Sequence, residues 1–109
     1  MTDALKVLGQ SALAATTLTD VYTVPAATST TVSTLTVCNR GGASGTFRLS
    51  VAIGGAADTA AQYIYYDQYL DANSTFAATV GITLAATDKI RAYASSANFS
   101  VNIFGVEVS

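Results

Sequence analysis

The chain has 109 residues, of which 50% are hydrophobic and only 11% are charged, and it contains no histidine. This length suffices for one domain with a buried core and is too short for two. The five lysines and arginines are scattered, so the clustered basic surface that binds nucleic acid or anionic membranes is missing. With no histidine and a single cysteine, the chain lacks the residues of histidine-dependent catalysis and of Cys/His metal sites. We therefore expect a single-domain protein that is not an enzyme, holds no cofactor or metal, and binds neither nucleic acid nor membrane.

The low charge also describes the expected surface. A typical globular domain is roughly 25% charged, so much of the outside here must consist of threonine, serine, alanine, glutamine and asparagine. Such a surface offers little electrostatic protection against self-association. We expect it to be covered by other copies of the chain or by a large neighbouring molecule.

The first fifteen residues leave two alternatives open. The spacing of Leu5 and Leu8 fits one face of a helix, and a strand through Val7 fits about as well. Residues 1–15 are then either an N-terminal arm that grips a partner or the first strand of the domain, since terminal segments stay loose unless something ties them down. Residues 16–109 are expected to form a single β-sandwich domain.

Alternation of apolar with small or polar residues dominates the rest of the chain. The clearest example predicts that Phe47, Leu49, Val51 and Ile53 are buried and that Arg48 and Ser50 face outward. A second alternating run, with Phe99, Val101 and Ile103 on the same side, is expected to pack against the first. After this run the alternation changes at Gly105, which indicates a bulge or a bend there.

Short strands separated by turn residues predict the fold class. The further strands are expected at residues 18–24, 32–39, 62–70, 75–84 and 89–95, with glycine, asparagine, aspartate and serine between them. Seven to eight strands at this spacing are typical of an all-β antiparallel β-sandwich, of jelly-roll or immunoglobulin-like topology.

The tyrosine cluster in residues 62–70 is the most distinctive group of side chains. Strict alternation would place Tyr63, Tyr65 and Tyr69 on one face together with Asp67, and Tyr66 on the opposite face. Tyrosine is enriched at binding surfaces because it offers a large rigid area with a polar tip. Three interpretations stay open: contact with another protein chain, packing within the sandwich, and binding of a glycan.

Two smaller features have simple interpretations. Asp67 and Asp71 could supply oxygen ligands to a weak calcium site, but turn chemistry explains them better because no full calcium-loop pattern is present. Cys38 is expected on a covered face of its strand, where a thiol behaves as a small hydrophobic group and is unreactive.

Several strand-and-turn motifs along nearly the whole chain are similar to those of one known family. They are Leu8-Gly9-Gln10-Ser11, Thr17-Leu18-Thr19-Asp20-Val21-Tyr22-Thr23-Val24-Pro25-Ala26, Val37-Cys38-Asn39-Arg40-Gly41, Tyr63-Ile64-Tyr65-Tyr66-Asp67, Ala72-Asn73-Ser74-Thr75-Phe76, Gly81-Ile82-Thr83-Leu84-Ala85-Ala86-Thr87-Asp88 and Phe104-Gly105-Val106-Glu107. The chain thereby resembles a family of small structural proteins of tailed-bacteriophage virions, of the decoration or minor tail type. The resemblance implies a β-sandwich without enzymatic activity that is part of the virion, assembled in the bacterial host cytoplasm.

The functional expectation joins this resemblance with the composition. A non-enzymatic virion protein would associate with itself, as a trimer or next as a hexamer, and dock on capsid or tail proteins of the phage. The alternative is a carbohydrate- or receptor-binding module at the tail tip, which would use the tyrosines. The candidate interface residues are Leu5, Val7, Leu8, Tyr63, Tyr65, Tyr66 and Tyr69.

Overall fold

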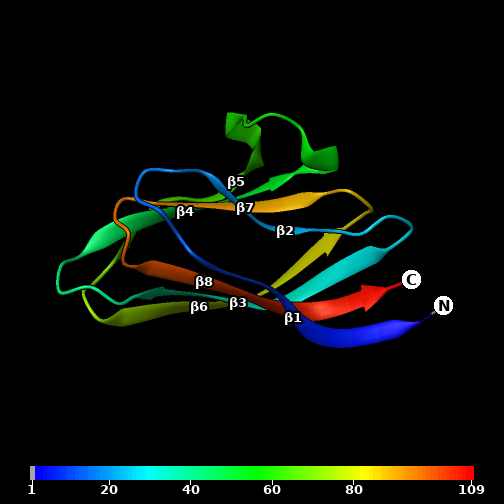
Figure 1. Ribbon diagram of the computed structural model, residues 1–109, viewed down its shortest axis with the longest axis horizontal. Helices are drawn as coiled ribbons and strands as arrows, with labels where there is room; N and C mark the ends of the chain where they lie inside the picture. The colour runs from blue at the N-terminus through cyan, green and yellow to red at the C-terminus, as the bar shows by residue number, and fades with distance from the viewer. Residues whose placement is uncertain (1) are drawn as a thin grey trace.

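Two four-stranded antiparallel sheets lie face to face in the computed structural model, which describes residues 2–109 (Figure 1). The elements in chain order are β1 (Asp3–Ala12), β2 (Thr19–Thr23), β3 (Ser29–Asn39), β4 (Gly45–Ala52), the 3-10 turns η1 (Ile53–Gly55) and η2 (Ala60–Gln62), β5 (Tyr63–Leu70), β6 (Ser74–Leu84), β7 (Lys89–Ala94) and β8 (Phe99–Val108). The predicted all-β sandwich is confirmed. No helix among the described residues is long and apolar enough to cross a membrane.

The order of the strands identifies the type of sandwich. One sheet, here called sheet A, has the order β1-β8-β3-β6, and the other, sheet B, has the order β2-β7-β4-β5. The hydrogen-bonded neighbours therefore include the pairs β1 and β8, β2 and β7, β3 and β6, and β4 and β5. A long antiparallel hairpin that is rolled up has this pairing of its two arms. This order is that of a jelly roll rather than of an immunoglobulin domain.

The core lies between the two sheets and is apolar. Buried side chains from both sheets form one cluster, in which the ring of Phe47 from sheet B lies 6.5 Å from that of Phe99 in sheet A. Phe47, Leu49, Phe99, Val101 and Ile103 are buried as predicted, and Val51 packs partly buried against the same cluster. Inward alternation of β4 and β8 therefore explains their part of the core.

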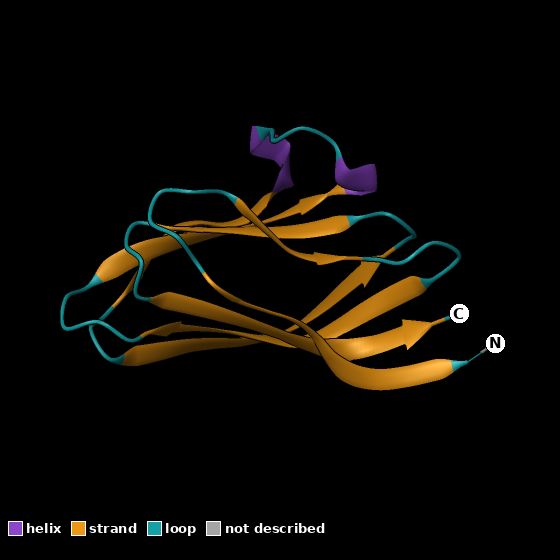
Figure 2. Cartoon of the chain, in the orientation of Figure 1, coloured by secondary structure: helices purple, strands orange, loops and turns teal. Residues whose placement is uncertain are grey.

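At the end of β4 the prediction is wrong for Ile53 and incomplete for Ser50. Ile53 is 80% exposed because the strand ends at Ala52 and the chain turns away at Gly54, whose φ is +62°. Ser50 does face outward, but it is fully buried there. The segment 53–62, with both 3-10 turns, lies over the outer face of sheet B (Figure 2) and is held by Arg91, which donates hydrogen bonds to the carbonyls of residues 55 and 56. Since Ser50 pairs with Arg91, it lies beneath this segment.

The first strand joins the sandwich directly. β1 pairs with β8 along its length, from Asp3 opposite Val108 to Ala12 opposite Ser100, so these residues form neither a helix nor a separate arm. The two ends of the chain lie together at one end of the molecule (Figure 1), where residues 2 and 109 exchange backbone hydrogen bonds. Met1 lies outside the described residues.

A line of bulges crosses sheet A near Gly105. The expected irregularity appears as extra residues in the neighbouring strands. Ser33 in β3 is unpaired opposite the step from Phe104 to Gly105, and Leu8 in β1 is unpaired opposite the step from Ile103 to Phe104. The inserted Leu8 turns into the core and is only 9% exposed. Gly105 allows the close approach of β3, because a Cβ atom there would overlap the carbonyl oxygen of Thr31.

Candidate functional site

The outer face of sheet A carries very few charged side chains. Strand register places its outward side chains in rows that run across all four strands. From one end to the other these rows are Ala12, Ser100, Cys38 and Thr75; Gln10, Asn102, Thr36 and Ala77; Val7, Phe104, Thr34 and Thr79; and Leu5, Val106, Thr31 and Thr83. None of these residues is an aspartate, glutamate, lysine or arginine, and the next row, formed by Asp3, Val108 and Ser29, adds one acidic residue at the end where Leu5 lies. The composition predicts a surface with few charged residues, and the outer face of sheet A is such a surface.

One end of this face is distinctly apolar. Leu5 is 87% exposed and Val7 is 48% exposed, and they lie opposite Val106 and Phe104 of β8. An open hollow of about 320 Å³ lies here, and its lining combines Leu5, Phe104, Val106 and Gly105 with the polar residues Thr31, Ser33 and Lys6. Two of the three N-terminal candidates are therefore available to a partner, whereas the third, Leu8, is not because it is buried in the core.

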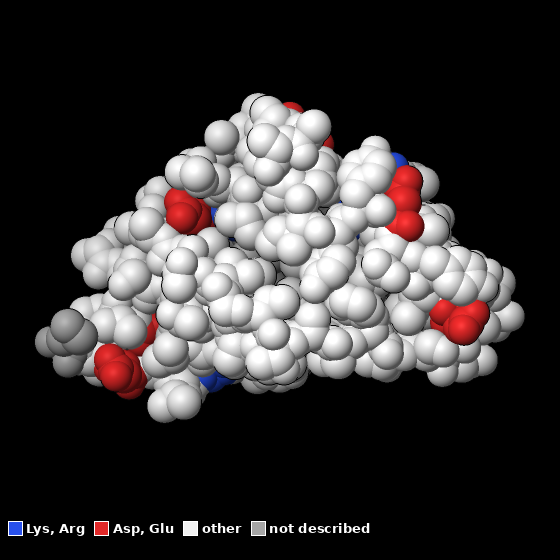
Figure 3. Space-filling model, turned by 180° about the vertical axis from the view of Figure 1, so that it is seen from behind, with Lys and Arg blue, Asp and Glu red and all other residues white. Residues whose placement is uncertain are grey.

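The free edge of sheet A is also unprotected. β6 is an outermost strand of eleven residues, and its sequence contains no charged residue and no proline. Edge strands offer unpaired backbone groups to other chains, and natural proteins usually block them with charge, proline or a short length. On the side of the molecule shown in Figure 3, the acidic and basic residues form only a few separate patches, and the rest of the surface is uncharged.

The tyrosines of β5 do not follow strict alternation. Two register shifts interrupt the pairing of β5 with β4, and Asp67 adopts a left-handed backbone with φ of +50°. As a result Tyr65 points into the sandwich, where its ring lies 5.0 Å from that of Phe76. Tyr63 and Tyr66 come together on the outer face instead, with ring centres 5.1 Å apart and planes at 87°. The predicted grouping of Tyr63 with Tyr65, opposite Tyr66, is wrong because each bulge moves the next side chain to the other face.

Arg48 joins the exposed tyrosines into a cluster. Its guanidinium lies 4.2 Å from the ring centre of Tyr66 and 4.4 Å from that of Tyr93, so it is stacked between two rings. Its Nε donates a 2.7 Å hydrogen bond to Asp67, and this bond raises the pKa of the guanidinium further. Asp67 is thus an ion-pair partner, and no cluster of three or more potential metal ligands occurs among residues 2–109.

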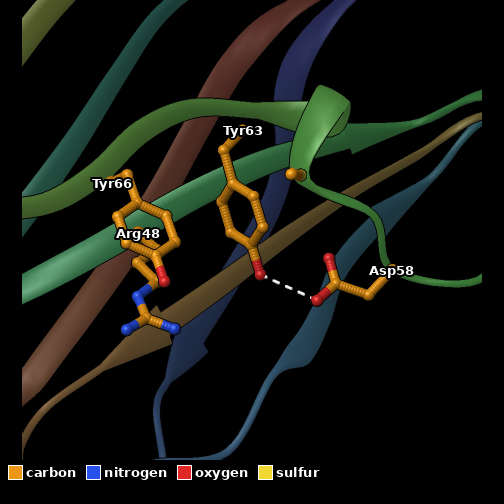
Figure 4. Close-up of a pocket in the computed structure, with 5 residues that line it drawn as sticks. Arg48, Asp58, Tyr63 and Tyr66 are labelled. Atoms are coloured by element: carbon orange, nitrogen blue, oxygen red, sulfur yellow. Dashed lines mark hydrogen bonds between the residues drawn. The ribbon is translucent and has the colours of Figure 1, made fainter.

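An open hollow adjoins this cluster. It measures about 560 Å³ and is lined by Arg48, Asp58, Ala60, Tyr63 and Tyr66. Tyr63 lies between Arg48 on one side and Asp58 on the other (Figure 4). Its hydroxyl donates a 2.9 Å hydrogen bond to Oδ2 of Asp58, and burial, followed by this bond, raises the pKa of Tyr63. At neutral pH the phenol therefore stays protonated and keeps the carboxylate in place.

Sequence reasoning missed three members of this cluster. Tyr93 was not singled out, although it lies two residues from Arg91 on the outward side of β7, where alternation would have placed it. Arg48 was expected to face outward, but its stacking between rings depends on strand pairing of residue 48 with residue 93. Asp58 lies in the segment that covers sheet B, whose path no local pattern predicts. Tyr69, in contrast, stands apart from the hollow and is 59% exposed.

Comparison with known proteins adds no relative. No protein-family model, curated protein or solved structure matches the chain. Functional inference therefore depends on the residues and surfaces described above.

Proposed function

We propose that this chain is a non-enzymatic structural protein of a tailed-bacteriophage virion, which associates with copies of itself and docks on capsid or tail proteins. Two observations support the proposal. Strand-and-turn motifs that resemble those of small virion proteins extend along nearly the whole sequence. The jelly-roll order of the strands is also common among viral capsid domains, although it occurs in lectins and enzymes as well.

The scarcity of charge on the outer face of sheet A is the observation that supports self-association. Strands lie about 4.8 Å apart and rise about 3.3 Å per residue, so four strands of ten residues cover on the order of 600 Å² in projection. The accessible area is larger because side chains protrude, which brings it near the roughly 800 Å² per partner of a stable interface. With exposed Leu5 and Val7 at one end, this face fits a second copy of the same chain.

Three copies in a closed ring are the proposed assembly, with six as the next choice. Virions are built on symmetry axes, and a ring closes when one surface of each copy meets a different surface of the next. The face of sheet A would supply one surface, and the open β6 edge is suited to supply the other.

Light scattering on the purified chain tests the proposal. At micromolar concentration we expect a particle of three times the 11.1 kDa chain mass. Gln10→Lys places a charge on the proposed interface and should shift the particle toward monomer, because a buried unpaired charge is strongly unfavourable. Gln68→Lys adds the same charge on an equally exposed glutamine of β5 in sheet B and should leave the mass unchanged.

Two results would contradict the proposal. The native chain could remain monomeric at every concentration, which would remove self-association. Gln10→Lys and Gln68→Lys could also behave alike, which would remove sheet A as the interface. Docking on the particle is tested separately, by asking whether the chain co-purifies with phage heads or with tails after the two are separated.

A further inference from the structure

We infer that the hollow beside Tyr63 and Tyr66 is a binding site for a neutral sugar ring at the surface of a glycan. This activity goes beyond the proposed structural role, since it uses the outer face of sheet B and leaves sheet A free. The hollow has aromatic walls, polar groups at opposite ends and a balance of charge that suit such a ligand.

The aromatic walls suit the apolar face of a pyranose. One side of such a ring carries C–H groups, and these pack well against the electron-rich face of an aromatic side chain. Tyr63 and Tyr66 present two surfaces at 87° to one another, with ring centres 5.1 Å apart. Tyr66 is 60% exposed, so a large part of its ring remains accessible to a ligand. The volume of about 560 Å³ lies within the range typical of small-ligand sites.

Polar groups stand at the two ends of Tyr63 (Figure 4). Asp58 accepts one hydrogen bond from Tyr63 at Oδ2, so its second oxygen remains for a hydroxyl donor from the ligand. Arg48 uses two of the five N–H donors of a guanidinium on Asp67, and its other donors remain for hydroxyl or ring oxygens. Each hydroxyl group of a sugar can both donate and accept a hydrogen bond. Neighbouring hydroxyl groups can therefore donate to Asp58 and accept from Arg48.

The charges favour a neutral ligand over an ionic one. A cation that would stack on Tyr66 meets Arg48, which already occupies that position between the rings of Tyr66 and Tyr93. An anion meets the carboxylate of Asp58, while the positive charge of Arg48 is already paired with Asp67. A polyhydroxylated neutral molecule uses both ends without bringing a like charge to either.

The groups are also held in position before a ligand arrives. Arg48 is fixed by Asp67 and by two rings, and Asp58 by the hydroxyl of Tyr63. The segment that carries Asp58 is anchored to sheet B by hydrogen bonds from Arg91 to the carbonyls of Gly55 and Ala56. Such preorganisation reduces the entropy lost on binding.

An NMR titration with a panel of methyl pyranosides (glucoside, galactoside, mannoside and N-acetylglucosaminide) tests the inference. We expect at least one of them to shift the ring resonances of Tyr63 and Tyr66, with a dissociation constant on the order of 1 mM. Asp58→Asn should weaken binding about ten-fold or more, as expected when a hydrogen bond to a charged group is lost. Ala60→Phe should abolish it by filling the hollow at an exposed position.

Tyr66→Ala and Tyr69→Ala form the matched pair of variants. Both residues are on β5 and are similarly exposed, at 60% and 59%, but only Tyr66 lines the hollow. Tyr66→Ala should lose binding and Tyr69→Ala should keep it, with circular dichroism showing that both remain folded. If none of the methyl pyranosides shifts any resonance, or if Tyr69→Ala weakens binding as much as Tyr66→Ala, the site is not a sugar site. The same titration of the Gln10→Lys variant shows whether sugar binding depends on the proposed self-association. Binding that is unchanged in this variant means that the two proposals stand or fail independently.

Discussion

Tyr22 and Glu107 are 85 residues apart in the chain, yet the Tyr22 hydroxyl donates a 2.6 Å hydrogen bond to Oε2 of Glu107. Because Tyr22 belongs to β2 of sheet B and Glu107 to β8 of sheet A, this bond joins the two sheets. The same hydroxyl lies 2.8 Å from the hydroxyl of buried Thr30, and Lys6 pairs with the other oxygen of Glu107 at 2.9 Å. A polar network thus closes the end of the sandwich at which the chain termini lie.

Tyr22→Phe removes one hydroxyl from this network and should destabilise the fold. Thr30, which is buried, and Glu107, whose side chain is 12% exposed, would each lose a partner, and a buried polar group left unsatisfied costs about 1–3 kcal/mol. Urea denaturation measures the change. Tyr69→Phe, at an exposed tyrosine for which no side-chain hydrogen bond is seen in residues 2–109, should stay within about 0.5 kcal/mol of the native chain. Equal effects would show that the inter-sheet network contributes nothing.

Stability should fall at both ends of the pH scale. Hydrogen bonds from Tyr22 and then Lys6 lower the pKa of Glu107 from 4.5, so its contribution is present above pH 4.5 and is lost as the pH falls through the lowered value. Burial, and then the bond to Glu107, raises the pKa of Tyr22 to about 12. Its contribution is therefore present below pH 10 and is lost as the pH rises toward 12.

Urea midpoints measured across pH check this dependence. In Glu107→Gln the loss of stability in acid should become smaller, although Asp20 retains part of it because its pKa is lowered mainly by the hydrogen bond from Lys89. An acid transition unchanged by Glu107→Gln would be inconsistent with the lowered pKa of this residue.

Gly105→Ala should destabilise the sandwich, whereas Gly81→Ala should not. A Cβ at Gly105 would overlap the Thr31 carbonyl and lie only 3.1 Å from Cδ1 of Leu8, and overpacking of this kind costs about 1–3 kcal/mol. At Gly81 no atom lies within 4 Å of the added methyl, so the substitution should be neutral or stabilising by about 0.4–1 kcal/mol. Thermal denaturation distinguishes them, and a stable Gly105→Ala would mean that the bulges of sheet A are easily rearranged.

Cys38 should report whether sheet A is covered. The expectation of a covered thiol is not met within a single chain, because Val37 points inward and Cys38 is partly exposed on the outer face, in the row at the end opposite to Leu5. If this face joins copies, labelling of Cys38 by a thiol reagent should slow as protein concentration rises. In Gln10→Lys the labelling should stay fast. A rate independent of concentration would argue against an interface at this position.

Local pattern was sufficient for most of the sandwich and failed at its irregularities. Residues such as Phe47 and Val101 are buried because strict alternation holds through the middle of β4 and β8. In β5 the same rule misplaces Tyr65, because two bulges and the left-handed Asp67 change which face each side chain occupies. An inserted residue has no distinctive composition, so its presence is decided by the strands on either side.

The fold class, the core positions of β4 and β8 and the shortage of surface charge could be predicted from the sequence, since these follow from alternation and composition within single segments. The jelly-roll order, the grouping of uncharged side chains on sheet A, and the meeting of Arg48, Asp58 and Tyr66 around one hollow arise only in the folded chain. The difference arises because alternation acts between adjacent residues. Strand order, bulges and the path of segment 53–62 depend instead on packing and hydrogen bonds between residues far apart in the chain.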